Sequence, residues 1–519
     1  MLTLPLEPTD DLADPAFKNP ASCKQWLAQL QLTNLQPAHS QLLTQLSEFN
    51  RYPMRSKDRL ETLELLRETI AYVQDSYAKK LISKPLPLNE NELEIFTSIV
   101  QLWQVFASCY LRCLRIYVSG DNQLSMHGAL LCQRCLLYSG LTIFEHLRSS
   151  YEFDPVYWHQ LHELYAFAET NNLLLTEVSD PLNTIQPVST CQSIYVKTLL
   201  ASYARPAELN RQQLQLLDEW LSEWSSMVTV ESNFSRSKGD AQPLAIDLAS
   251  ENGLRPIQHH EHNATTRYIA MIPLSKLLRV TSILLQQGQK TKHLKLNKNF
   301  KVDDCVDFLA FLHQCWCEEL NTRFGERQSA SHETRLCYNL ENIYTHLSKQ
   351  SHQNSDAQDE HESQRETWHL ENESILGARL TRESINGGRL GYNQLIALQP
   401  VDTTTVILGA TSWVLGTTTW VNVERAGQLK IGVRYLPGAA VAIRFTDPDN
   451  IDAENNFPAF LLQTVPALKS PPSLILPHGH FKLGHIIEIK HSNADNQAIR
   501  LDFCVEHGID FDRISYTLV

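Results

Sequence analysis

The stretch LKIGVRY, residues 429–435, places an apolar side chain at every second position. The apolar positions are Leu429, Ile431, Val433 and Tyr435. Polar residues or glycine stand between them. Because neighbouring side chains of a strand point to opposite faces, this alternation predicts a β-strand with one buried face.

Strand-like runs continue on both sides of this stretch. Residues 395–423 carry a single charge, but their proline, glycines and many threonines indicate strands and turns rather than a membrane helix. An isoleucine-rich run at 486–489, a polar turn at 491–496 and an apolar alternation at 499–505 predict a further hairpin. The pattern leaves open whether the chain end, residues 451–519, completes a first β unit or forms a second small one.

The chain before residue 320 shows a different period, because its apolar residues recur at steps of three and four. Examples are Leu63, Leu66, Ile70 and Val73; Val100, Trp103, Phe106, Tyr110 and Leu114; and Leu214, Leu217, Leu221 and Trp224. A last helix is predicted for residues 302–320. Residues 1–320 are therefore expected to form a helical bundle or array, as one domain or as two subdomains.

Length and composition agree with a folded protein of several domains. At 519 residues the chain is longer than one hydrophobic core usually supports. The change of period near residue 320 predicts an α+β protein, with a helical N-terminal region and a β-rich C-terminal region.

Charge excludes some functions and suggests a location. The net charge of −13 argues against broad binding to nucleic acid or anionic lipid, which needs a basic surface. The N-terminal stretch MLTLPLEPTDDLADP has acids and prolines where a signal peptide would have a basic start and an apolar run. Eleven cysteines without an export signal indicate reduced thiols. The sequence thus predicts a cytoplasmic protein without membrane insertion.

Two arginines stand where the helical pattern gives way to the strand pattern. Arg323 and Arg327 have the spacing R-x-x-x-R, which lets two planar guanidinium groups converge on one ligand. Guanidinium binds phosphate and the O6 and N7 edge of guanine bidentately, and its face stacks on a purine. A ligand with phosphates and guanines suits this pair.

A second polar group follows at residues 372–377, NESILG. Asn372 and Ser374 are two residues apart and are expected on one face of a strand. The amide can donate and accept at a base edge, and the hydroxyl can bond a phosphate oxygen. Gly377 has no Cβ that would block a close approach.

R-x-x-x-R followed by [D/N]-x-S-x-x-G on an early strand of a small six-stranded barrel resembles the motif pair of PilZ domains, a family that binds cyclic di-GMP. The resemblance implies a PilZ-like β-barrel at residues 321–450, followed by a C-terminal β extension at 451–519. It also implies that the ligand cyclic di-GMP contacts Arg323, Arg327, Asn372, Ser374 and Gly377. The layout looks like that of PilZ-containing proteins of some proteobacteria.

Two features depart from the family pattern, and a second S-x-x-G competes with the first. The segment from Gln328 to Thr334 is polar, where many members of the family enter a strand. Residues 348–367 have no apolar residue except alanine and are expected to form a solvated loop. A competing S-x-x-G runs from Ser384 to Gly387, but Arg382 stands where Asn or Asp is expected. The glycines at 387 and 388 fit a turn between strands.

Two clusters resemble metal sites. Cys132 and Cys135 have a zinc-like spacing with Cys109 and Cys113 upstream, but they lie in apolar helical stretches and are expected to fill the core. The run HHEH at 259–262 lies in a polar loop without a second set of ligands. The sequence contains no P-loop, G-x-S-x-G or HExxH motif. An enzyme is therefore not indicated.

The first hypothesis is therefore a cytoplasmic cyclic di-GMP receptor without a cofactor. Nucleotide binding at the barrel would change how the helical region meets a protein partner, such as pilus, flagellar or secretion machinery. The second hypothesis is a constitutive interaction scaffold with a barrel that does not bind nucleotide. A metal protein that uses the cysteines or the HHEH run is the third.

Overall fold

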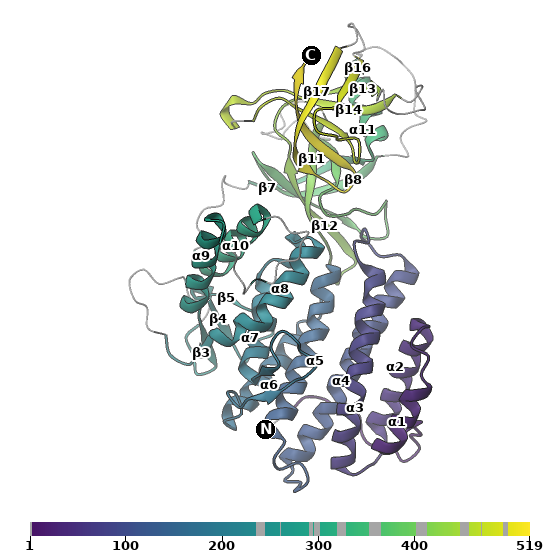
Figure 1. Ribbon diagram of the computed structural model, residues 1–519, viewed down its shortest axis with the longest axis vertical. Coiled ribbons are helices and arrows are strands. Elements are labelled where there is room, and N and C mark those ends of the chain that lie inside the picture. Colours follow the sequence, from purple (N-terminus) through teal and green to yellow (C-terminus); the bar gives the residue numbers. More distant parts are fainter. Residues whose placement is uncertain are drawn as a thin grey trace. The chain divides into compact units, whose positions relative to one another are not determined.

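The computed structural model describes the whole chain except residues 1–2, 235–243, 260, 290–293, 295–301, 319–327, 352–364, 401–412, 447–455, 469 and 491–496. The chain divides into two compact units. The helical unit comprises residues 1–83 and 88–322, and the barrel unit comprises residues 84–87 and 323–519. Figure 1 shows the mainly helical character of the first and the strands of the second.

Ten α-helices are described in the helical unit. They are α1 (Pro20–Gln29), α2 (Leu35–Arg51), α3 (Ser56–Ala78), α4 (Glu90–Val118), α5 (Gly128–Ser149), α6 (Val156–Thr170), α7 (Cys191–Tyr203), α8 (Arg211–Trp224), α9 (Ile272–Gln286) and α10 (Val302–Cys317). Short 3-10 turns are η1 (Lys79–Leu81), η2 (Pro206–Glu208), η3 (Ser225–Met227) and η4 (Ile257–His259). Within the described residues, no helix is both long enough and apolar enough to span a bilayer.

The strands of this unit are few and short. They are β1 (Val178–Ser179), β2 (Val188–Ser189), β3 (Thr229–Glu231), β4 (Leu244–Asp247), β5 (Arg255–Pro256) and β6 (Thr266–Ala270). The first two pair with each other, and the other four form one sheet in the order β3-β6-β4-β5. The predicted helical character of this half of the chain is confirmed.

The long helices begin and pack as the sequence pattern requires. Asn89 caps α4 through a reciprocal pair of bonds with Glu92, which satisfies backbone donors that the first turn leaves free. The apolar stripes predicted on α3 and α4 are buried in one continuous core. Cysteines at 109, 113, 132 and 135 are buried there, as expected for core residues.

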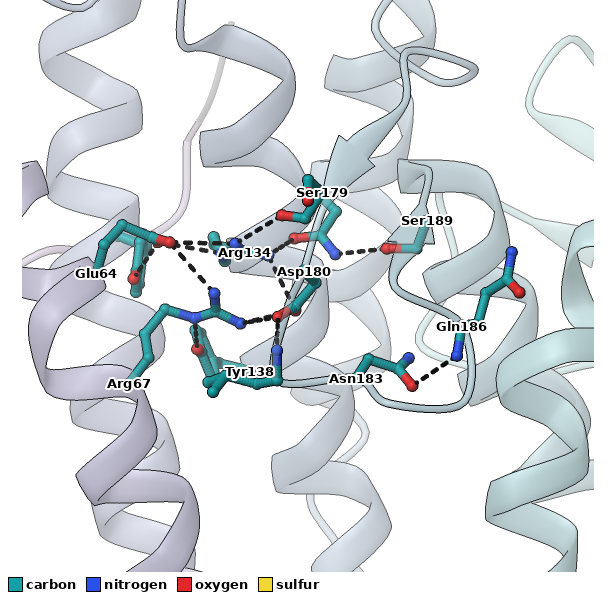
Figure 2. Close-up of polar contacts among 12 residues, drawn as sticks. Glu64, Arg67, Arg134, Tyr138, Ser179, Asp180, Asn183, Gln186 and Ser189 are labelled. Carbon is teal, nitrogen blue, oxygen red and sulfur yellow. Dashed lines mark hydrogen bonds and ion pairs between the residues drawn. The ribbon is translucent and has the colours of Figure 1, made fainter.

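A buried ion-pair network ties the β1–β2 loop to α3 and α5 (Figure 2). Asp180, on this loop, accepts two bonds of 2.7 Å from Arg67 of α3. Arg134 of α5 lies 3.1 Å from the same carboxylate and 3.1 Å from both oxygens of Glu64. Tyr138 accepts a bond of 2.8 Å from Arg67. Two guanidinium groups and two carboxylates therefore balance one another inside the helical core.

The barrel unit contains two closed six-stranded barrels. Barrel 1 has the strand order β10-β11-β12-β9-β8-β7 and barrel 2 the order β13-β14-β15-β18-β17-β16. The strands of barrel 1 are β7 (Gln328–Tyr338), β8 (Glu366–Ser374), β9 (Gly377–Glu383), β10 (Leu395–Pro400), β11 (Val414–Val423) and β12 (Gln428–Tyr435). Those of barrel 2 are β13 (Ala440–Thr446), β14 (Phe457–Leu462), β15 (Ser473–Pro477), β16 (Ile486–Lys490), β17 (Gln497–His507) and β18 (Phe511–Leu518).

The alternation in LKIGVRY is confirmed by strand β12. Leu429, Ile431 and Val433 are buried and Tyr435 is half-buried, while Arg434 is exposed. The predicted hairpin of the tail is also present, since Ile487 of β16 pairs with Ile499 of β17. Barrel 2 begins at Ala440, ahead of residue 451, where the sequence pattern placed the start of a β extension.

Two local expectations need correction. The polar segment from Gln328 to Thr334 is strand, because β7 begins at Gln328 and pairs with both β8 and β10. The helix α11 (Leu340–Ser351) and the start of β8 take up both ends of the predicted loop at 348–367, and residues 352–364 lie outside the described part. Helix α11 forms there because it buries Ile343 and Leu347 in a core that both barrels share.

The β17–β18 turn joins barrel 2 to barrel 1. Ile509 donates its backbone N–H to Asn393 O at 3.0 Å, and Leu395 N donates to the Asp510 carboxylate at 3.0 Å. Burial raises the pKa of the Asp510 carboxyl to about 6. The charged form of this side chain is therefore destabilised at neutral pH.

We expect the replacement Asp510→Asn to stabilise the barrel unit at pH 7.5 but not at pH 4. Since the folded-state pKa lies above the unfolded value, the wild type loses stability as pH rises from about 4 to about 6. The amide avoids this loss, worth about 2 kcal/mol, and its oxygen still accepts from Leu395. Thermal unfolding of both proteins across this pH range checks the expectation, and parallel pH profiles would contradict it.

Candidate functional site on the outer face of barrel 1

The predicted ligand residues fall into two groups. Arg323 and Arg327 lie within residues 319–327, outside the described part of the chain. Asn372 and Ser374 belong to β8, and Gly377 is the first residue of β9. The structure therefore places three of the five residues, all at one β-hairpin.

The S-x-x-G segment is the tight turn of this hairpin. Ser374 pairs with Gly377 across a two-residue turn of exposed Ile375 and Leu376. The Ser374 hydroxyl is buried and donates to Gly377 O at 3.2 Å. A Cβ on Gly377 would lie 2.0 Å from Val433 O, so only glycine fits against β12 here.

Strand register shows which face of the barrel these residues occupy. Glu373 lies opposite Ala378, and both are buried inside barrel 1. Asn372 lies opposite Arg379, and Ser374 lies opposite Gly377. Since neighbours along a strand alternate between faces, Asn372, Ser374 and Gly377 belong to the outer face. The structure places the two polar residues on one face, as the two-residue spacing predicted.

The residue between them has an internal role. Glu373 accepts a bond of 2.7 Å from the Tyr435 hydroxyl inside the barrel. Burial raises the pKa of the Glu373 carboxyl, although the bond from Tyr435 lowers it. Burial likewise raises the pKa of Tyr435. This pair satisfies two buried polar groups and takes no part in the outer surface.

The outer face also carries an arginine–tryptophan pair that no sequence motif predicted. The Arg379 guanidinium lies over the Trp420 ring, 5.6 Å from its centroid. A Cβ on Gly432 would lie 2.1 Å from Trp420 Nε1, so the indole lies directly against β12. A glycine inside a strand pattern often marks such a close approach. What we call the outer-face cluster consists of Asn372, Arg379, Trp420 and Gly432.

Acidic residues hold the cluster in position. Glu371 forms ion pairs with Arg379 Nε at 2.8 Å and with Lys430 Nζ at 3.1 Å. Lys430 also lies 2.7 Å from Glu424. Burial lowers the pKa of Lys430, but its bonds to the two carboxylates outweigh burial and raise it. The Arg379 guanidinium is thus held by an ion pair at the barrel surface, over the Trp420 ring.

The competing S-x-x-G at residues 384–387 surrounds a different feature. A pocket of about 610 Å³ lies there, lined in part by Glu366 and Arg382. The Arg382 guanidinium is buried, lies 4.8 Å from the centroid of Trp368 and pairs with Glu366 at 3.1 Å. It also donates to backbone carbonyls of the turn. Arg382 is therefore engaged in holding the predicted turn at 387–388.

The HHEH run at 259–262 was the second candidate metal cluster, and one of its histidines contacts a tyrosine. His262 Nδ1 lies 2.7 Å from the Tyr268 hydroxyl, and His260 lies outside the described residues. In the described part of the HHEH run, His262 is therefore engaged with a tyrosine of β6.

Two family models match the chain. Residues 21–236 match the family described as "Cyclic-di-GMP receptor FimW, N-terminal domain", and residues 441–519 match the "FimW C-terminal beta-barrel domain". The first range lies in the helical unit except for residues 84–87, and the second covers nearly all of barrel 2. Barrel 1 and its outer-face cluster lie between the two matched ranges.

A curated relative gives the same assignment. The protein named Cyclic-di-GMP receptor FimW from Pseudomonas aeruginosa is 24% identical over 336 residues, which cover 63% of this chain and 53% of the relative. The chain thus spans about half the length of the curated relative that it matches. The range that matches the N-terminal domain is mainly helical in the structure. The range that matches the C-terminal β-barrel domain forms barrel 2. Residues 21–236 and 441–519 of the chain are therefore similar to the N-terminal domain and the C-terminal β-barrel domain of FimW.

Proposed function

We propose that the chain is a receptor for cyclic di-GMP and that the nucleotide binds on the outer face of barrel 1. The observation that carries the proposal is the outer-face cluster beside the N-x-S-x-x-G hairpin. Arg379 and Trp420 offer planar groups for stacking on a purine, and Asn372 offers an amide for a base edge. The name of the curated relative supports the same ligand.

The hairpin supports the proposal through its shape. Gly377 leaves the outer face flat where a side chain would collide with β12, and the exposed Ile375 and Leu376 border this area. Arg323 and Arg327, which precede β7 in the chain, are assigned the phosphates and the guanine edges. The ligand would gather their segment against β8.

The further steps of the proposal concern signalling. Contact of the nucleotide with Arg323 and Arg327 would alter how the helical unit meets a protein partner, because their segment joins the two units in sequence. A ligand shifts such an equilibrium only by its different affinity for the two arrangements. The chain would act in the cytoplasm, without a cofactor and without catalysis.

Titration calorimetry with cyclic di-GMP tests the proposed site. We expect Arg379→Ala to weaken binding about tenfold, since it removes a stacking contact worth about 1–2 kcal/mol. The matched control is Arg500→Ala, which removes an arginine of barrel 2 whose side chain is 54% exposed. Equal affinity of the wild type and Arg379→Ala would overturn the assignment of this surface. Absence of binding by the wild type would favour a constitutive scaffold instead.

A further inference from the structure

Three potential metal ligands meet on barrel 2, far in sequence from the proposed nucleotide site. They are His478 in the loop after β15, His507 at the end of β17 and Asp512 near the start of β18. Their ligand atoms all lie within 4.8 Å of one another. Within the described residues, this is the one group of three or more His, Cys, Asp or Glu side chains with that geometry.

The carboxylate is the centre of the group. Asp512 Oδ1 lies 3.1 Å from His478 Nδ1 and 2.8 Å from His507 Nδ1. Asp512 Oδ2 accepts the backbone N–H of Gly479 at 3.0 Å. Ligand atoms around a tetrahedral zinc ion lie about 3.3 Å apart, given bonds of about 2.0–2.2 Å. A small outward shift of the two rings would therefore admit a metal ion between the three atoms.

Burial makes the carboxylate an unusual surface feature. The Asp512 side chain is 3% exposed, and among the described residues it pairs with no lysine or arginine. Buried carboxylates are usually paired with a cation or bound to a metal. Within the described part of the chain, the partners of this carboxylate that can carry charge are two histidines, which are 57% and 61% exposed. A divalent cation would balance the buried charge and keep coordination positions open to solvent.

A backbone donor and a cysteine lie next to the three proposed ligands. The N–H of Gly479 fixes the free carboxylate oxygen, as outer-shell donors commonly do in metal sites. Cys504 Sγ lies 3.4 Å from His507 Nδ1, but it also donates to the backbone carbonyl of Glu506 at 3.3 Å. We assign Cys504 no ligand role, because its sulfur is not in the group that lies within 4.8 Å.

We propose that His478, His507 and Asp512 bind one divalent transition-metal ion of the zinc class, with water or a partner's side chain completing the shell. Imidazole nitrogen and carboxylate oxygen are ligands that zinc accepts, and three protein ligands leave a coordination position open. The ion would join the loop after β15 to the β17–β18 hairpin. Residues 509 and 510 of this hairpin contact barrel 1, so the ion would stabilise the junction of the two barrels.

Zinc titration of the chelator-treated full chain tests the site. We expect one zinc ion per chain, bound with micromolar or tighter affinity, and a higher melting temperature in its presence. The double variant His478→Ala, His507→Ala should weaken zinc binding at least 100-fold and lose the thermal shift. Both rings are exposed, so this variant should fold. Cobalt(II) should give visible absorption bands with the wild type but not with the double variant.

Two controls separate the site from general metal binding. His369→Ala removes an exposed histidine of β8 and should bind zinc as the wild type does. Cys504→Ser should also retain zinc, and loss of the site in that variant would overturn the proposed ligand set. Equal zinc binding by the wild type and the double variant would overturn the site itself. A wild type that binds no zinc would also overturn the site. The three residues would then form a hydrogen-bonded cluster without a metal ion.

Discussion

The replacement Asp180→Asn is expected to lower the free energy of unfolding of the helical unit by about 3–5 kcal/mol. The amide keeps the shape of the side chain but removes the charge that faces two buried guanidinium groups. Arg67 is 5% exposed and Arg134 is 1% exposed, so solvent cannot replace the lost partner. Glu64 alone would then face both arginines in the core.

Urea unfolding followed by far-ultraviolet circular dichroism measures this loss, since most of the helical signal comes from the helical unit. The matched control is Asp75→Asn, which removes one exposed partner of Lys79 on the surface of α3. Exposed pairs contribute about 0–1 kcal/mol, so the control should unfold almost as the wild type does. Equal stability of Asp180→Asn and Asp75→Asn would show that the network contributes little.

The network also predicts a sign for pH dependence. Burial alone would raise the pKa of Glu64, but bonds and charge from Arg134, Arg67 and Tyr110 lower it below its usual value. A carboxyl with a depressed folded-state pKa stabilises the fold above its unfolded pKa. The stability of the helical unit should therefore fall as pH drops below about 4.5.

The replacement Gly377→Ala is expected to destabilise barrel 1 by about 3 kcal/mol and to abolish nucleotide binding. The added methyl group would lie 2.0 Å from the backbone oxygen of Val433, which cannot move without breaking the β9–β12 pairing. Its effect is purely steric, because Gly377 does not have a positive φ. Thermal unfolding and a cyclic di-GMP titration below the melting temperature measure the two effects.

The matched control for this replacement is Gly391→Ala. Its added methyl group would meet the end of the Ile509 side chain at 2.6 Å, and a flexible side chain can rotate away. We expect a small change in stability and none in affinity. A Gly377→Ala protein as stable as this control, with wild-type affinity, would show that the hairpin does not need the close approach to β12.

The sequence predicted the strands and side-chain faces that depend only on residues close together in the chain. The alternation at 429–435 identified β12, and the spacing of Asn372 and Ser374 placed both on one face. The spacing succeeds because the bulge in β8 lies between Leu370 and Asn372, before the motif begins. A bulge between the two polar residues would have sent them to opposite faces.

What the sequence did not predict depends on pairing between distant segments. Arg379 meets Trp420 only because β9 and β11 both pair with β12 in one register. Helix α11 was missed because its polar composition hides two apolar residues four apart, Ile343 and Leu347, which face the shared core. Closure of barrel 2 likewise requires β13 to pair with both β14 and β16, and no local sequence pattern predicts this pairing.

A calorimetric titration of cyclic di-GMP into the full chain and into the double variant Arg323→Ala, Arg327→Ala distinguishes a receptor from a constitutive scaffold. We expect saturable binding by the wild type and at least 100-fold weaker binding by the variant, because two bidentate contacts are lost. Both proteins should unfold at similar temperatures. Equal affinity of the two proteins would contradict the role of the two arginines, and no binding by a folded wild type would contradict a cyclic di-GMP receptor.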